Sequence, residues 1–203
     1  MPRLKNHPDN IAANASTRAR LLAAACEEFV GNGYYATDTN KIAERADLAP
    51  ATFYRHFKNK AEIFTVVLEQ QVAEEAQELA RRGLDCYRAT GSLDEAAKIS
   101  AQLLIESRRR LAKLRLDAET ILATDDAMVQ ARLAARRSII KTLKEFAAVV
   151  GATVCPDEEL HVRMHVINSL ADAIARGQFE LNGVTPETAM RELIAQWKAC
   201  FLR

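Results

Sequence analysis

Glycine and proline are scarce in this chain, and they fall in short stretches between long runs rich in Ala, Leu, Glu, Arg and Gln. The 203 residues include only 7 Gly and 5 Pro. The long runs favour helix, because Ala and the straight-chain residues lose little side-chain freedom there. No segment alternates polar and apolar residues as a half-buried strand would. The predicted fold class is therefore all-α.

The breaks separate short helices near the front from longer helices behind them. A first helix is expected to run from a cap at Ser16 or Thr17 to about Val30, and Thr37 suits the N-cap of a second, short helix. Pro50 suits the first position of a third short helix, where its missing N–H costs nothing. The longer helices are expected at about 60–82, 92–110, 112–123, 126–150, 157–178 and 186–202. Two short helices braced by a longer one are typical of a helix-turn-helix.

Charge and cysteine usage exclude several protein classes. With 28 basic and 27 acidic residues the formal net charge is +1, so a nucleic acid would have to be bound by a local patch. No run of about 18 apolar residues and no secretory signal is present, which predicts a cytoplasmic protein without a membrane partner. The four widely spaced cysteines, with no C-x-x-C pair, predict neither a disulfide framework nor a cysteine zinc site.

The third short helix has two unlike sides. Its apolar side carries Phe53 and Phe57, and its opposite side carries Ala51, Thr52, Arg55 and His56. Arg55 is suited to a bidentate contact with guanine, and Ala51 and Thr52 to a thymine methyl. Suited to phosphate oxygens are Tyr54, His56 and Lys60. The alternative is a plain helical hairpin with aromatic core residues and solvated Arg and Lys side chains.

Further motifs surround this helix in a fixed order: Leu21-Leu-Ala-Ala-Ala-Cys-Glu-Glu-Phe29, Gly33-Tyr34, Thr37, Ile42-Ala43, and Thr52-Phe-Tyr-Arg-His-Phe57 followed by Lys60. Over roughly residues 17–64 the chain resembles the DNA-binding domain of the tetracycline-repressor (TetR) family of transcriptional regulators. The resemblance implies contacts with the DNA backbone from Thr37, Tyr54, His56 and Lys60. It also implies that the bases are faced by Pro50, Ala51, Thr52 and Arg55. Arg3 and Lys5 would be either a minor-groove arm or a disordered tail.

The chain departs from the family pattern at three positions. Glu28 stands where the family usually has Leu, Asp47 where it usually has Gly, and Ala49 where it usually has Ser as a cap. Asp tolerates a left-handed turn better than most residues. Ala49 is a poorer cap, at a cost of about 1 kcal/mol that Pro50 partly offsets. We expect these departures to affect DNA affinity more than the fold.

The last two expected helices have apolar faces wider than one core contact needs. The helix from residue 157 has one stripe, Leu160, Met164, Ile167, Ala171 and Ile174, widened by Val162, Val166, Leu170 and Ala173. The last helix is capped by Thr185 and begins at Pro186. The extra width predicts burial against a second subunit in a two-fold homodimer. The predicted interface is Leu160, Val162, Val166, Leu170, Met190, Leu193, Ile194, Trp197 and Phe201.

Polar residues in the same region are candidates for binding a small-molecule effector. They are Asp117, Glu119, His161, His165, Asn168 and Asp172. The alternatives are a solvated face on the helix from residue 157, surface salt bridges for the two acidic residues, and a zinc site at His161 and His165. The run 108–110 of three arginines is interpreted as a solvated face.

These patterns together predict a helix-turn-helix DNA-binding domain at 15–62 and a helical effector-binding and dimerisation domain at 63–203. As the resemblance implies, the chain would bind a palindromic double-stranded operator as a homodimer, repress transcription, and be released by an unknown effector. We expect no cofactor and no enzymatic activity, because no nucleophile–base pair or phosphate-binding glycine loop is present. The alternatives are a helical metalloprotein or enzyme using His161 and His165, and an effector-independent DNA-binding protein.

Overall fold

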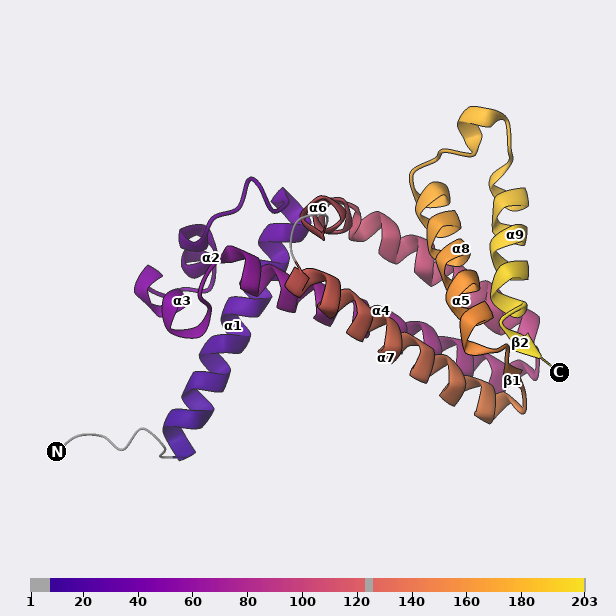
Figure 1. Ribbon diagram of the computed structural model, residues 1–203, viewed down its shortest axis with the longest axis horizontal. Coiled ribbons are helices and arrows are strands. Elements are labelled where there is room, and N and C mark those ends of the chain that lie inside the picture. Colours follow the sequence, from indigo (N-terminus) through magenta and orange to yellow (C-terminus); the bar gives the residue numbers. More distant parts are fainter. Residues whose placement is uncertain (1–7, 123–125, 203) are drawn as a thin grey trace. The chain divides into compact units, whose positions relative to one another are not determined.

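The structure, a computed structural model, describes residues 8–122 and 126–202, and most of these residues are helical (Figure 1). The helices are α1 (Pro8–Asn32), α2 (Thr39–Arg45), α3 (Pro50–His56), α4 (Lys60–Thr90), α5 (Leu93–Arg110), α6 (Ala112–Leu122), α7 (Asp126–Val150), α8 (Asp157–Ala175) and α9 (Pro186–Lys198), with a 3-10 turn η1 (Glu180–Asn182). Two short strands, β1 (Thr153–Val154) and β2 (Phe201–Leu202), pair antiparallel. The all-α prediction is confirmed. Arg3 and Lys5 lie outside the described residues.

The chain forms two compact units, and each unit contains two separate stretches of the sequence. The first unit comprises residues 1–70 and 112–131, and the second comprises 71–111 and 132–203. The helix α4 contributes to both, and α6 belongs to the first. The domain boundary between residues 62 and 63 stays a prediction.

In the first unit, the cap of α2 differs from the one predicted. Asp38, not Thr37, is the N-cap, and its carboxylate accepts the N–H groups of Asn40 and Lys41, both at 2.9 Å. The Thr37 hydroxyl is buried and donates to the carbonyl oxygen of Gly33 at 2.8 Å. Both residue types cap helices well, so the sequence did not show which of the two neighbours does so.

The turn between α2 and α3 agrees with its predicted chemistry. Asp47 has a φ of 53°, in the left-handed region. Ala49 caps α3 without a side-chain hydrogen bond, and Pro50 follows at the start of the helix. The guanidinium of Arg20 on α1 donates to the carbonyl oxygens of Ala46 (2.6 Å) and Asp47 (3.1 Å). These bonds hold the turn against α1 and fix the direction in which α3 leaves it.

An aromatic core supports these short helices. The rings of Phe29 and Phe64 meet edge to face with their centroids 5.0 Å apart, and Phe53 and Phe57 lie 5.8 Å apart. All four side chains are buried. Because α3 has only seven residues, burial of Phe53 and of the C-cap residue Phe57 is the main force that holds it in place.

The second unit packs the later part of α4 with α5, α7, α8 and α9. The helix α4 continues through Gly83 to Thr90, so the predicted end at residue 82 is wrong. Gly83 is buried in a close approach, where an added Cβ would lie 2.8 Å from the Ser100 hydroxyl oxygen and 3.4 Å from the ring of Phe146. The helix α9 ends at Lys198 and not at 202, because Phe201–Leu202 pairs with Thr153–Val154.

Candidate functional site

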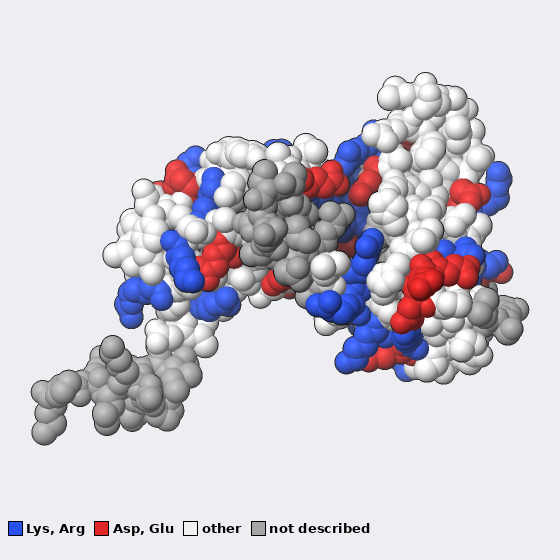
Figure 2. Space-filling view, viewed as in Figure 1, with Lys and Arg blue, Asp and Glu red and all other residues white. Residues whose placement is uncertain are grey.

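The helix α3 has the two-sided character that the sequence predicts. Phe53 and Phe57 are buried, whereas Tyr54 is 59% exposed. Also exposed are Pro50, Ala51 and Arg55, and half-buried are Thr52 and His56. Lys and Arg side chains gather over this part of the first unit in Figure 2. The exposed side of α3 therefore offers hydrogen-bonding and cationic groups on a rigidly held helix.

Arg18 on α1 extends this exposed surface, and the sequence analysis missed it. Its guanidinium lies 4.9 Å from the centroid of the Phe57 ring, at the end of α3. Partial burial lowers the pKa of the His56 imidazole, and the positive charges of Arg55 and Arg18 lower it further. His56 and the two arginines thus lie close together. No sequence pattern marks Arg18, because its contact with Phe57 depends on tertiary packing.

Tyr54 links the two short helices. Its phenol oxygen lies 3.0 Å from the hydroxyl oxygen of Thr39 at the start of α2. This hydrogen bond keeps an exposed aromatic side chain in a defined position. A preorganised side chain loses less conformational entropy when it meets a ligand than a free side chain would.

Lys60 is used inside the first unit. Its ammonium group donates to the carbonyl oxygens of Tyr34 (2.8 Å) and Thr37 (2.9 Å) and lies 4.0 Å from the centroid of the Tyr34 ring. Burial lowers the pKa of Lys60, while the carboxylates of Asp38 and Asp117 oppose this shift. Lys60 and the buried Thr37 therefore fasten the α1–α2 loop and do not present free polar groups.

Asp117 on α6 fastens the same loop. Its carboxylate accepts the N–H of Tyr34 at 2.6 Å and lies so close to Gly33 that an added Cβ would be 2.9 Å from it. The neighbouring Lys113 donates to the carbonyl oxygen of Gly31 at 2.6 Å. Asp117 thus belongs to the first unit, apart from the candidate effector residues of α8. Glu119 is exposed on the same helix.

Glu28, where the family pattern has an apolar residue, makes an ion pair between α1 and α2. Its carboxylate accepts from the Arg45 guanidinium at 2.5 Å and from the Asn32 amide at 2.8 Å. The hydrogen bond from Arg45 is the main cause that lowers the pKa of Glu28, against the opposing effect of burial. Arg45 also reaches the exposed Glu27 at 3.1 Å.

Comparison with known proteins identifies this helix-turn-helix. Residues 21–67 match the model of the family described as bacterial regulatory proteins, tetR family. This segment belongs to the tetR family. The transcriptional activator FasR of Mycolicibacterium smegmatis is 37% identical over 67 residues, which are 33% of this chain and 31% of that protein. The HTH-type regulator YvkB of Bacillus subtilis is 38% identical over 72 residues, 36% of this chain and 38% of that protein. The matches thus span about a third of the length of these two relatives.

The tetR-family fold extends over both units. A tetR-family regulator of Mesorhizobium loti aligns with a TM-score of 0.66 at 17% identity, over 92% of this chain and 95% of that one. A transcriptional regulator from Saccharomonospora viridis in complex with choline aligns with a TM-score of 0.60 at 16% identity, over 93% and 99% of the two chains. Among the described helices, none is long and apolar enough to cross a membrane.

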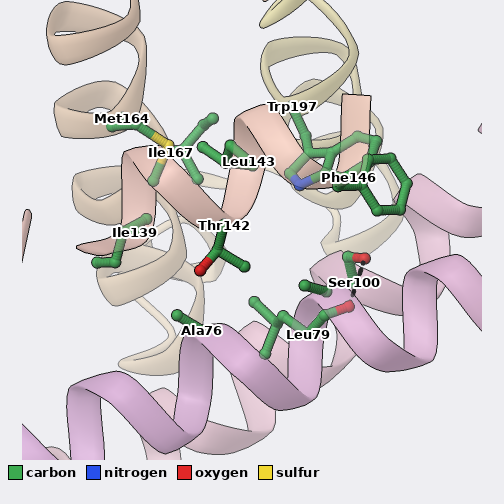
Figure 3. Close-up of a pocket in the computed structure, with 11 residues that line it drawn as sticks. Ala76, Leu79, Ser100, Ile139, Thr142, Leu143, Phe146, Met164, Ile167 and Trp197 are labelled. Carbon is green, nitrogen blue, oxygen red and sulfur yellow. Dashed lines mark hydrogen bonds between the residues drawn. The ribbon is translucent and has the colours of Figure 1, made fainter. Parts of the chain in front are cut away.

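The second unit contains an apolar pocket of about 500 Å³, a volume that includes space open to solvent (Figure 3). It is lined by Ala76, Leu79, Ala80, Ser100, Ile139, Thr142, Leu143, Phe146, Met164, Ile167 and Trp197. None of the six candidate effector residues is among them. The sequence did not reveal the pocket, because residues that line an apolar pocket have the same pattern as core residues.

The candidate effector residues of α8 divide into two groups. His161 and His165 are exposed, and the described residues contain no group of three or more His, Cys, Asp or Glu placed to hold a metal. Asn168 and Asp172 instead meet Arg108. Arg108 is only 3% exposed, so the prediction of a solvated face for this arginine is wrong.

The predicted dimer residues also fall into separate groups. Leu160, Leu193 and Phe201 are buried in the core of the second unit, so their assignment to a surface is wrong. Partly buried against that core are Leu170, Met190, Ile194 and Trp197. Val162 and Val166 are exposed, at 65% and 40%. The wide apolar face of α8 is thus part core and part surface.

Proposed function

We propose that this tetR-family chain is a DNA-binding regulator of transcription that places the exposed side of α3 in the major groove. The observation that carries the proposal is the division of α3 into a buried aromatic side and an exposed side without acidic residues. A helix presented in this way can bring side chains to base edges while its neighbours contact the backbone. The family match of residues 21–67 supports the same role.

The proposed contacts follow from exposure and chemistry. Facing the bases are Pro50, Ala51, Thr52 and Arg55, with Arg55 bidentate to a guanine. Contacting phosphates are Tyr54, His56 and Arg18. Thr37 and Lys60 act indirectly, because they hold the α1–α2 loop and present its backbone N–H groups at a fixed place.

We further propose that the chain acts as a homodimer on a palindromic operator. One seven-residue helix makes few base contacts, so useful affinity requires two linked half-site contacts. The exposed Val162 and Val166 on α8 support a partner surface there.

Repression and release by an effector complete the proposal. A small molecule in the second unit would favour a dimer whose recognition helices do not fit the operator. A 100-fold loss of operator affinity requires a preference of about 2.7 kcal/mol for that state. The pocket in the second unit has the apolar lining typical of small-molecule sites, and the regulator from Saccharomonospora viridis was solved with choline.

Selection of bound DNA from a random duplex pool by the purified full chain tests the proposal. We expect a two-fold symmetric motif. Arg109→Ala, an exposed arginine of the second unit, serves as the control and should select the same motif. No enrichment, or a motif without symmetry, would contradict DNA recognition by a dimer. In a reporter strain, a promoter that overlaps the selected motif should be less active when the chain is expressed.

A further inference from the structure

A charged cluster is buried in the second unit around Arg108. Its Nε atom lies 3.3 Å from an oxygen of Asp172, and its Nη2 atom lies 3.6 Å from an oxygen of Glu75. The Nη2 group also donates to the side-chain oxygen of Asn168. The Ser107 hydroxyl donates to the second carboxylate oxygen of Glu75. Three helices, α4, α5 and α8, thus meet at one guanidinium.

This cluster leaves donors of Arg108 unused. Its Nη1 atom is buried and has no hydrogen-bond partner among the described residues. Its Nε atom is also buried and is paired with the Asp172 carboxylate by charge, without a hydrogen bond. A buried donor without an acceptor destabilises the fold, and more so when it carries charge. The structure therefore holds a buried cationic donor that an additional acceptor would stabilise.

The cluster borders one end of the apolar pocket. Glu75 lies one turn before the pocket residue Leu79 on the same face of α4, and the Asn168 amide donates to the carbonyl oxygen of the pocket residue Met164, one turn before it on α8, at 2.7 Å. In Figure 3, Ala76 and Ile139 lie at one end of the pocket, and Phe146 and Trp197 lie at the other. Since Glu75 and Asn168 both contact Arg108, the cluster lies about one helical turn beyond the pocket lining on α4 and α8.

The charges of the cluster restrict what such a molecule can be. One guanidinium and two carboxylates give the cluster a formal charge of −1. A further anion would be repelled by Glu75 and Asp172 in a poorly solvated place. A cation would bring donors, where Arg108 needs an acceptor. An uncharged oxygen acceptor, such as a carbonyl, satisfies both conditions.

We propose that the effector of this protein is an elongated, uncharged and mainly apolar molecule whose terminal carbonyl or similar oxygen accepts a hydrogen bond from Arg108. This inference rests on the proposed function, in which the second unit takes a small-molecule effector. The aromatic end of the pocket binds the apolar part of the ligand, and the Arg108 cluster selects the uncharged polar end.

Calorimetric titration of the full chain without DNA tests the ligand class. The probes are 2-octanone, octanoate and octylamine at pH 7.5, which share an eight-carbon chain and differ in charge. We expect 2-octanone to bind at least about tenfold tighter than the other two, as for one hydrogen bond from a charged donor. Equal or tighter binding of octanoate or octylamine would overturn the proposal.

Two variants of the cluster separate the effect of its negative charge from the effect of the hydrogen bond that Arg108 donates. Asp172→Asn removes one negative charge from a half-buried side chain, so it should narrow the preference for 2-octanone over octanoate by about tenfold. Arg108→Met should weaken 2-octanone binding by at least about tenfold, whereas Arg109→Met, an exposed neighbour, should leave it unchanged. If Arg108→Met does not fold, the Asp172→Asn ratio still decides, and an unchanged ratio would contradict the proposal.

The same measurements keep this inference separate from the proposed function. Binding in the calorimeter requires no operator. If 2-octanone binds as expected but leaves operator affinity unchanged, release by an effector is wrong and the ligand class stands. If operator DNA is selected but no probe shows the expected preference, DNA recognition stands and the ligand class is wrong.

Discussion

Arg55 and Arg18 are both cationic, but their positions in the first unit indicate different roles in DNA binding. Arg55 projects from the exposed side of α3, and Arg18 projects from α1 over the end of that helix. A side chain in the groove can distinguish base pairs, whereas one beside the groove meets phosphates that every sequence has. The two arginines should therefore differ in what their removal changes.

Arg55→Ala should relax base preference at one position of each half-site and cost roughly 1–3 kcal/mol per half-site. Selection from a random pool measures this effect. An unchanged selected motif for Arg55→Ala would refute its assignment to a base.

Arg18→Ala should weaken binding to all sequences alike and reduce the slope of affinity against salt by about one counterion per half-site. Titrations at several salt concentrations measure this effect.

His56 makes a prediction about pH. In the free protein, burial and two neighbouring arginines lower its pKa, so the imidazole is mainly neutral at pH 7. A phosphate contact favours the protonated form and raises the pKa in the complex. Affinity for DNA should therefore increase as pH falls through the pKa that His56 has in the complex. It should level off below the pKa that His56 has in the free protein. His56→Gln should abolish this increase, and His165→Gln, on exposed α8 surface, should retain it.

At the scale of elements, the sequence predicted helices well and their ends less well. Thr185 and Pro186 mark the start of α9 as predicted, because a cap and a first-turn proline are local signals. Gly83 misled the prediction, because glycine there permits the close approach of α4 to Ser100 and Phe146 and does not end the helix. The end of α9 was wrong because pairing of residues 201 and 202 with β1 is a long-range contact that no local pattern shows.

The candidate site was predicted in the same uneven way. The two sides of α3 follow from helical periodicity and were predicted correctly. The contacts of Lys60 and Asp117 with the α1–α2 loop depend on tertiary packing, so their residue types alone suggested other roles. The position of Arg108 shows the same limit, since a run of three arginines contains one that is buried by two neighbouring helices.

The Glu28–Arg45 ion pair should make the contact of α1 with α2 depend on pH. Because Arg45 lowers the pKa of Glu28 in the folded state, the pair stabilises the fold above the unfolded pKa of about 4.3. This contribution is lost as pH falls through the lower pKa that Glu28 has in the folded state. Glu28→Gln should speed hydrogen exchange of the α1 and α2 amides at least about threefold at pH 7 and have less effect near pH 4. Glu27→Gln, at the exposed partner of Arg45, should have little effect at either pH.

At the scale of the whole molecule, α8 has more apolar surface than its own chain covers. Leu160, Ile167 and Ala171 are buried in the second unit, while Val162 and Val166 remain exposed. Exposed valines spaced four apart lie on one face of a helix. Under the proposed function, this face is covered by the same face of a second copy, as two-fold symmetry requires.

Introducing charge on that face should therefore separate the subunits and reduce operator binding. In Val162→Asp/Val166→Asp, four carboxylates would meet across the two-fold axis, and their repulsion and desolvation oppose association. Sedimentation should show monomers at concentrations where the unchanged protein is a dimer. Operator affinity should fall at least about 100-fold, because the second half-site contact is no longer linked to the first. Val149→Asp, at an exposed valine of α7, adds charge elsewhere and should leave both measurements unchanged. A double variant that remains dimeric would place the partner surface on another face of the second unit.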